Sequence, residues 1–301
     1  MHLFSIDPGS SRKGWATWVA NGSSRTTASN VHRPIGDLPR LVDELCSMAA
    51  DGPVAIAVDA PIRAFDGIQA PSTFTPLGAA RGRASWPFDV NPFSQRACEK
   101  ALSSRPKTSS LLARDLAKVV ESLCGGDVSF AKAHPGVSVL GCMSAPHAPV
   151  VRAFLAALTE RAGASGISVD YELGLPASAK TIRVLETHPA VALGFYAAMG
   201  VRPFPSRIPV YKGSKANPGD FEALVDAVVT HLNAKHGCTV RRPADDDELD
   251  SLVGLLNLLD LAHGSGDFFG TEDGYFLVPA PAEGKGFADV WRAERGRCCR
   301  A

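Results

Sequence analysis

The chain lacks several features that would assign it at once to a simple class. It has 301 residues, and its 31 Lys and Arg residues are balanced by 31 Asp and Glu residues, so it carries no net positive charge to attract nucleic acid over a broad surface. No apolar run approaches the ~20 residues that span a bilayer. We therefore expect no membrane partner, and only local contacts with any nucleic acid.

Two further absences concern the cellular compartment. The first residues do not combine a basic start, a long apolar run and a cleavage site, so we expect no signal peptide. The seven cysteines are odd in number and contain no C-x-x-C pair, which argues against a disulfide framework. These features predict reduced thiols and a cytoplasmic protein.

What the sequence does contain is acidic residues placed where apolar strands end. A short apolar strand leads into Asp7 and the turn that follows, and Pro8 restricts Asp7 to extended backbone. A second apolar run, 54–58, is typical of a strand covered on both faces and ends in Asp59. Each Asp could be a ligand, or could instead cap its own turn.

A third predicted strand, 181–185, leads into Glu186 and His188, after which Pro189 begins a helix. Two residues apart, Glu186 and His188 point the same way if the strand continues to them. Either could act as a metal ligand or general base. The alternative is that this segment only caps the helix.

The last predicted helix begins with a dense acidic cluster, 245–250. Asp247 and Asp250 are three residues apart and share one helix face, while apolar residues cover most of the other faces. Because a buried, uncompensated carboxylate costs several kcal/mol, we predict that Asp250 binds a metal ion. We expect Asp245, Asp246 and Glu248 to interact with the helix dipole.

Together these carboxylates predict an oxygen-rich pocket. Asp7, Asp59 and Asp250 are the expected metal ligands, with Asp247 and Glu186 as further catalytic candidates. Carboxylate oxygens are ligands that suit Mg²⁺ or Mn²⁺. Such a pocket can hold two metal ions ~4 Å apart for phosphodiester cleavage, one activating a water and the other stabilising the leaving oxygen.

Basic and aromatic residues supply candidates for substrate binding. The segment 62–93 is rich in Pro, Gly and Arg and has no clear periodicity, so we interpret it as a functional loop. Its alternative is a solvated surface loop, and solvation is also the alternative for Lys212. The residues predicted to clamp phosphate or stack on a base are Arg81, Arg83, Trp86, Arg96, His188 and Lys212.

The order of predicted elements favours one α/β domain, 1–301, with insertions at about 62–93 and 201–218. Three strands read as an antiparallel meander, and helix-linked strands follow. If the strand ending at Asp59 lies beside the first strand, Asp7 and Asp59 emerge close together. The sequence therefore predicts a mixed sheet flanked by helices.

Several motifs resemble a known superfamily. Ile6-Asp7-Pro8-Gly9-Ser10 with Gly14-Trp15-Ala16 resembles the first hairpin of RuvC-type Holliday junction resolvases, and Asp247-Glu-Leu-Asp250-Ser-Leu resembles their closing D-x-x-D-A-L helix. Val58-Asp59-Ala60-Pro61 and Glu186-Thr-His188-Pro189 are similar to a family of predicted RNase H-like nucleases, the domain of unknown function 429. The resemblance covers most of the chain and implies an RNase H-like fold.

What the resemblance implies is a divalent-metal nuclease site on Asp7, Asp59, Asp250 and Asp247. The chain departs from RuvC-type enzymes at Asp59, where they use Glu, and this shorter side chain changes the metal spacing or leaves room for Glu186. Two alternatives stay open: a nucleotide-dependent phosphotransferase of the actin type, and a non-catalytic RNase H-like binding protein.

Overall fold

The computed structural model describes residues 1–8, 15–21, 27–33, 37–60, 147–213, 216–271 and 274–280. The predicted insertion at 62–93 lies outside these residues. So do four of the residues predicted to bind substrate, Arg81, Arg83, Trp86 and Arg96.

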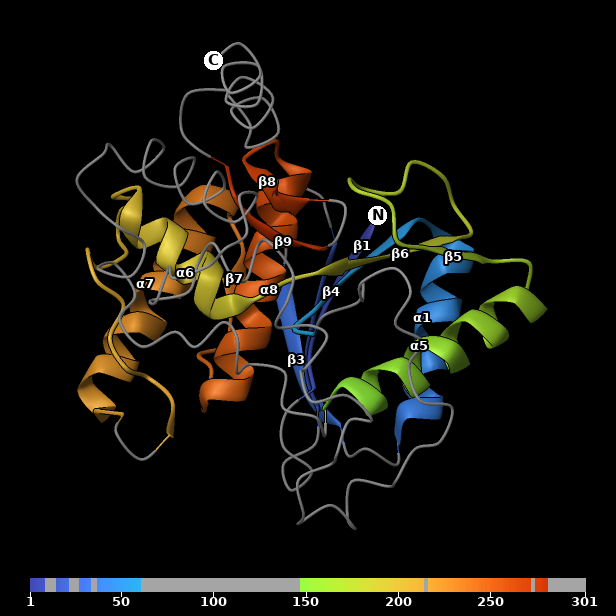
Figure 1. The fold of residues 1–301 in the computed structure, drawn as a ribbon, viewed down its shortest axis with the longest axis horizontal. Coiled ribbons are helices and arrows are strands. Elements are labelled where there is room, and N and C mark those ends of the chain that lie inside the picture. Colours follow the sequence, from blue (N-terminus) through green and yellow to red (C-terminus); the bar gives the residue numbers. More distant parts are fainter. Residues whose placement is uncertain are drawn as a thin grey trace, which may run out of the picture.

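A seven-stranded mixed sheet forms the centre of the described structure (Figure 1). Strand β2 is antiparallel to β1 and to β3, and the other neighbouring pairs are parallel. In spatial order the strands are β5 (Ser168–Asp170), β6 (Thr181–Glu186), β4 (Val54–Val58), β1 (His2–Asp7), β2 (Trp15–Asn21), β3 (Thr27–Arg33) and β7 (Thr239–Val240). The predicted α/β mixed sheet is confirmed, with β1 and β4 side by side.

Helices cover both faces of the sheet. Figure 1 shows α1 and α5 on one side and α6, α7 and α8 on the other. The elements outside the sheet are α1 (Leu38–Asp51), α5 (His147–Ala164), α6 (Pro189–Ala198), α7 (Pro218–His236), α8 (Asp246–Ala262) and the hairpin of β8 (Gly266–Thr271) and β9 (Gly274–Pro279). Within the part of the chain that the structure describes, no helix has the length and apolarity needed to cross a membrane.

The side chains of β1 alternate between the two faces of the sheet, and each face has its own hydrophobic core. Leu3 packs into the core with α6, α7 and α8, whereas Phe4 and Ile6 pack into the core with α1 and α5. In strand β4, Ala57 packs into the core with α6, α7 and α8, and Val58 packs into the core with α1 and α5. Because the sheet is covered on both sides, the central strand β4 is apolar and buried along its whole length.

Helix α8 approaches β1 unusually closely. The Ser5 hydroxyl donates to the Ser251 carbonyl at 2.6 Å, and the Ser251 hydroxyl donates to the Ser5 carbonyl at 3.2 Å. A Cβ atom built on Gly254 would lie 2.3 Å from Ser5 Oγ. On the neighbouring strand, Trp18 Nε1 donates to the Glu248 carbonyl at 3.0 Å. Helix α8 is therefore fixed over β1 and β2 in one register.

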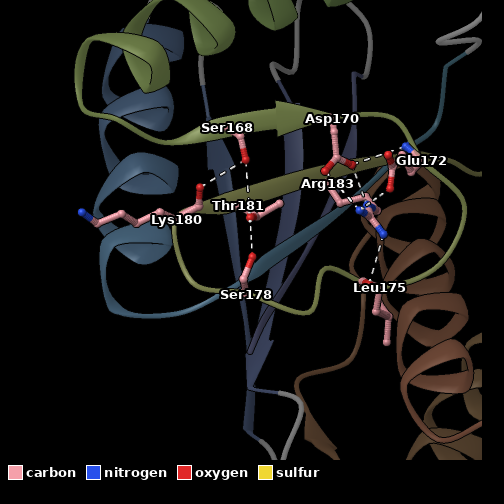
Figure 2. Close-up of polar contacts among 8 residues, drawn as sticks. All are labelled: Ser168, Asp170, Glu172, Leu175, Ser178, Lys180, Thr181 and Arg183. Carbon is pink, nitrogen blue, oxygen red and sulfur yellow. Dashed lines mark hydrogen bonds and ion pairs between the residues drawn. The ribbon is translucent and has the colours of Figure 1, made fainter.

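The edge strand β5 is held by an arginine on its neighbour β6. Arg183 Nε and Nη2 donate to the two carboxylate oxygens of Asp170, at 2.6 and 3.1 Å, and Nη2 also donates to Glu172 (Figure 2). Arg183 Nη1 donates to the Leu175 carbonyl at 3.2 Å. This bidentate contact ties the three-residue strand β5 to β6.

The segment 201–218, predicted as an insertion, has apolar anchors in the described residues 201–213. Phe204, Ile208 and Tyr211 are buried in the core shared with α6, α7 and α8. The Phe204 ring stacks on Tyr196 of α6, with centroids 4.3 Å apart. Residues 201–213 are therefore anchored in the core shared with α6, α7 and α8.

We predict that Gly254→Ala destabilises the protein by about 1–3 kcal/mol. The new methyl group would force Ser5 Oγ to rotate and lose its bond to Ser251. Urea unfolding measures the change in the free energy of unfolding.

Gly163→Ala is the matched control, because a Cβ at this α5 position meets nothing within 4 Å. It is expected to leave stability unchanged or to raise it slightly, since Ala favours helix. In the double variant Ser5→Ala/Gly254→Ala the clash is removed, so it should lose less stability than the sum of the single variants. Additive losses would contradict this account.

Candidate carboxylate site

The carboxyl ends of three neighbouring parallel strands carry acidic residues. Asp7 is the last residue of β1, Asp59 follows β4 directly, and Glu186 is the last residue of β6. The Asp59 amide donates to the Ile6 carbonyl at 3.0 Å, which holds Asp59 beside the end of β1. Parallel pairing of β1, β4 and β6 thus brings the three acids to one edge of the sheet.

The pleat of β1 aims Asp7 towards helix α8. Asp7 is on the same face of β1 as Leu3 and Ser5, because side chains alternate along a strand. Leu3 packs in the core with α8, and Ser5 is hydrogen-bonded to Ser251 of α8. Asp250 precedes Ser251 by one residue, so the contact that fixes α8 also fixes this carboxylate near Asp7. Asp250 is only 1% exposed.

Three of the predicted ligands meet at this point. Asp7, Asp59 and Asp250 each offer an oxygen, and these three oxygens all lie within 4.8 Å of one another. Two oxygens bound to one cation are separated by at most twice the metal–oxygen distance, roughly 4–5 Å for Mg²⁺ or Ca²⁺. The three carboxylates are close enough to share a single cation.

Burial raises the pKa of all three acids, and repulsion from neighbouring carboxylates adds to this effect. Burial is the largest cause for Asp7, whose pKa lies well above its usual range, followed by the charges of Asp59 and Asp250. Burial raises the pKa of Asp59 to about 7, against the opposing effect of the nearby Lys212 ammonium. Burial likewise raises the pKa of Asp250. Without a cation, the folded protein disfavours three negative charges here.

A second buried acid on the same helix shows the opposite behaviour. The carboxylate of Asp260 accepts from the Tyr196 hydroxyl, pairs with His236 Nε2 at 2.7 Å and with Lys235 Nζ at 3.0 Å. Burial acts to raise its pKa, but the contacts with His236 and Lys235 outweigh burial and lower it. The comparison distinguishes a carboxylate with a full set of partners from a cluster whose charge is still uncompensated.

Two consecutive residues of the 201–213 segment contact Asp250. The Tyr211 hydroxyl donates to Asp250 Oδ1 at 2.9 Å, and the Lys212 ammonium pairs with Asp250 Oδ2. Tyr211 is buried, whereas the Lys212 side chain is 47% exposed. Sequence analysis predicts substrate binding for Lys212 and does not identify Tyr211, because nothing in the local pattern distinguishes it from a core aromatic residue.

Glu186 and His188 are predicted site residues that the structure describes, and neither is among the three residues whose oxygens meet. Glu186 is 1% exposed, and its charge contributes to the raised pKa of Asp59. Alternation along β6 assigns Glu186 to the face of Val184, which packs with α1 and α5. His188 is the N-cap residue of α6, and its ring contacts Phe276 edge-on at 5.5 Å.

The first turn of α8 contains a second acidic group, Asp245, Asp246 and Asp247. The Asp245 side chain accepts from the Glu248 amide at 2.9 Å, so it caps the helix as expected of this acidic turn. Asp247 is part of this more exposed group, and its charge still raises the pKa of Asp7 and Asp59. We therefore place Asp247 at the rim of the site.

No family model, no curated protein and no solved structure matches this chain. The resemblance to RNase H-like nucleases thus stays an expectation, and the function has to be argued from the carboxylate site.

We predict that the metal-free protein loses stability as the pH rises from about 5 to about 8. The folded-state pKa of Asp59, about 7, exceeds its ordinary value of 3.8, so between these values the folded state binds more protons than the unfolded state. Its stabilising contribution is therefore complete below the ordinary value and is lost as the pH rises through 7. Asp59→Asn removes this titration.

The measurement is urea unfolding in EDTA at the two pH values. We expect Asp59→Asn to reduce the loss of stability between them by about 1–3 kcal/mol, allowing for the partial exposure of Asp59. Asp51→Asn, at the exposed end of α1, is the control and should retain the wild-type pH profile. Parallel profiles for wild type and Asp59→Asn would contradict the prediction.

Proposed function

We propose that the protein is a divalent-metal-dependent nuclease that hydrolyses phosphodiester bonds at the site of Asp7, Asp59 and Asp250. The observation that carries the proposal is the meeting of these three carboxylates, from β1, the end of β4 and α8, within 4.8 Å. Three carboxylates at this separation, with Asp7 and Asp250 buried, are best explained by a cation that neutralises them.

The architecture supports the same proposal at the level of the fold. Three antiparallel strands, a helix, parallel strands and a closing acidic helix occur in the order implied by the RNase H-like resemblance. We infer an RNase H-like fold on this basis. The carboxyl ends of the parallel strands are also where α/β sheets place their ligands.

The donor set fits Mg²⁺ or Mn²⁺, since it offers carboxylate oxygens and no thiolate or imidazole. When bound, such an ion would polarise a phosphoryl oxygen and lower the pKa of a coordinated water. The protein's own part is to hold the ligands: β1 and β4 fix Asp7 and Asp59, and the Tyr211 hydroxyl orients Asp250. Lys212 adds a positive charge beside Asp250.

The equal numbers of basic and acidic residues argue against a substrate that is held by a broad positive surface. Lys and Arg equal Asp and Glu in number, so a long duplex would gain little from general electrostatic attraction. We propose that the substrate is a short, single-stranded or branched nucleic acid, bound by local contacts.

The proposal is tested by cleavage of labelled single-stranded, duplex and branched DNA and RNA with Mg²⁺ or Mn²⁺, and with EDTA. Cleavage is expected with either metal and none with EDTA. Asp7→Asn should lower the rate at least about 100-fold, because it removes a direct metal ligand.

Asp220→Asn, in the exposed first turn of α7, is the matched control and should cleave like the wild type. Mn²⁺ titration calorimetry separates a nuclease from a binding protein that keeps only the fold. If Mn²⁺ does not bind, or binds equally to Asp7→Asn, the carboxylates are not its ligands and the nuclease proposal fails.

A further inference from the structure

The Lys212 ammonium occupies an unusual position for a half-exposed lysine. It pairs with Asp250 Oδ2, and its charge also lowers the pKa of Asp7 and Asp59. Burial acts to lower the pKa of Lys212 itself, but the charges of Asp250 and its neighbours outweigh burial and raise it. One ammonium therefore acts on all three carboxylates at once.

The chain holds this lysine in place through the residue before it. Tyr211 is buried and donates to Asp250 Oδ1, so consecutive residues contact the two oxygens of one carboxylate. Phe204 and Ile208, earlier in the segment, are buried in the core with α8. These anchors fix the path of the backbone at Lys212, and its charge is directed to the cluster without a large loss of chain entropy.

The charges of the cluster indicate how many metal ions it can take. When the three carboxylates that offer ligand oxygens are all ionised, the Lys212 ammonium reduces their three negative charges to two, which one divalent cation neutralises. A second divalent cation would have to bind beside the Lys212 ammonium without further carboxylates from this cluster. At separations of about 4 Å, such like-charge repulsion is substantial even at a partly exposed site.

We propose that Lys212 is a built-in second cation of the carboxylate site, so that the site takes one divalent cation where the carboxylates alone would take two. The number of metal ions rests on the proposed function, whereas the role of Lys212 as counter-charge to Asp250 does not. Lys212 is a positioning residue here, because it acts on the ligands and through them on the bound metal.

The proposed number of metal ions per chain is tested by measuring Mn²⁺ binding. The methods are calorimetry and electron paramagnetic resonance of the free ion. The wild type is expected to bind one Mn²⁺ per chain. Lys212→Met removes the ammonium and is expected to bind two, the first at least about tenfold more tightly. Lys212→Arg keeps the charge and should retain a count of one.

Arg207→Met is the matched control, because Arg207 is an exposed cation on the same segment. It should bind one Mn²⁺ with wild-type affinity. If Lys212→Met binds one Mn²⁺ with unchanged affinity, the proposal is overturned while the metal site stands. Tighter binding of a single ion overturns it as well, because Lys212 then competes for the position of the metal.

A double-mutant cycle in EDTA tests, in the absence of metal, whether Lys212 compensates the charge of Asp250. Lys212→Met alone should lower the melting temperature, since it leaves buried carboxylates without their cation. In the Asp250→Asn background the same change should cost clearly less, because the charge that Lys212 compensates is gone.

The two failures are distinguishable. If the wild type binds no Mn²⁺, the proposed nuclease site fails and the cycle alone decides the role of Lys212. Additive effects of Lys212→Met and Asp250→Asn would overturn the counter-charge assignment, and non-additive effects would support it.

Discussion

The close approach of α8 to β1 is the constraint on which the rest of the site depends. Two reciprocal hydrogen bonds between Ser5 and Ser251 and the missing side chain of Gly254 bring helix and strand into one register. A shift of this register would move Asp250 away from Asp7, since both lie one or two residues from these contacts. Backbone packing in the core thus determines the electrostatics of the site.

The same packing creates an energetic conflict. Carboxylates of β1, the end of β4 and α8 meet in a largely buried space, where burial and neighbouring negative charges disfavour their ionisation. Elsewhere on α8 the protein resolves a buried charge completely, with hydrogen bonds and ion pairs to Asp260. The cluster of three has Tyr211 and Lys212 as contacts of Asp250, and we propose that a divalent cation neutralises its remaining charge. Uncompensated charge in a folded protein costs stability, and this cost is the argument for the proposed ligand.

The segment 201–213 connects the hydrophobic core to the carboxylate site. Its apolar residues join the core, and its last residues reach the carboxylates, so that core packing positions a charged group at the site. This arrangement assigns a structural reason to a Pro-rich stretch that otherwise looks like a surface insertion. It also links the stability of the core around Tyr196 and Phe204 to the geometry at Asp250.

The sequence by itself determined the elements and the acids at their ends. Strand 54–58, the helix after Pro189 and the acidic start of α8 follow from local apolar patterns, and these patterns are set by residues close together in the chain. Sequence analysis also named Asp7, Asp59 and Asp250, because the local apolar pattern places the first two at strand ends and the third on a helix predicted to be buried. Only the tertiary structure decided which acids meet. The pleat of β6 places Glu186 on the face of the sheet opposite to Asp7, and the first turn of α8 places Asp247 at the rim of the carboxylate site. Tyr211 and Lys212 were brought to Asp250 from a segment with no periodicity, through contacts between residues about 40 positions apart. Local patterns fix which side chains are buried, but the partners of a buried charge depend on the register between distant elements.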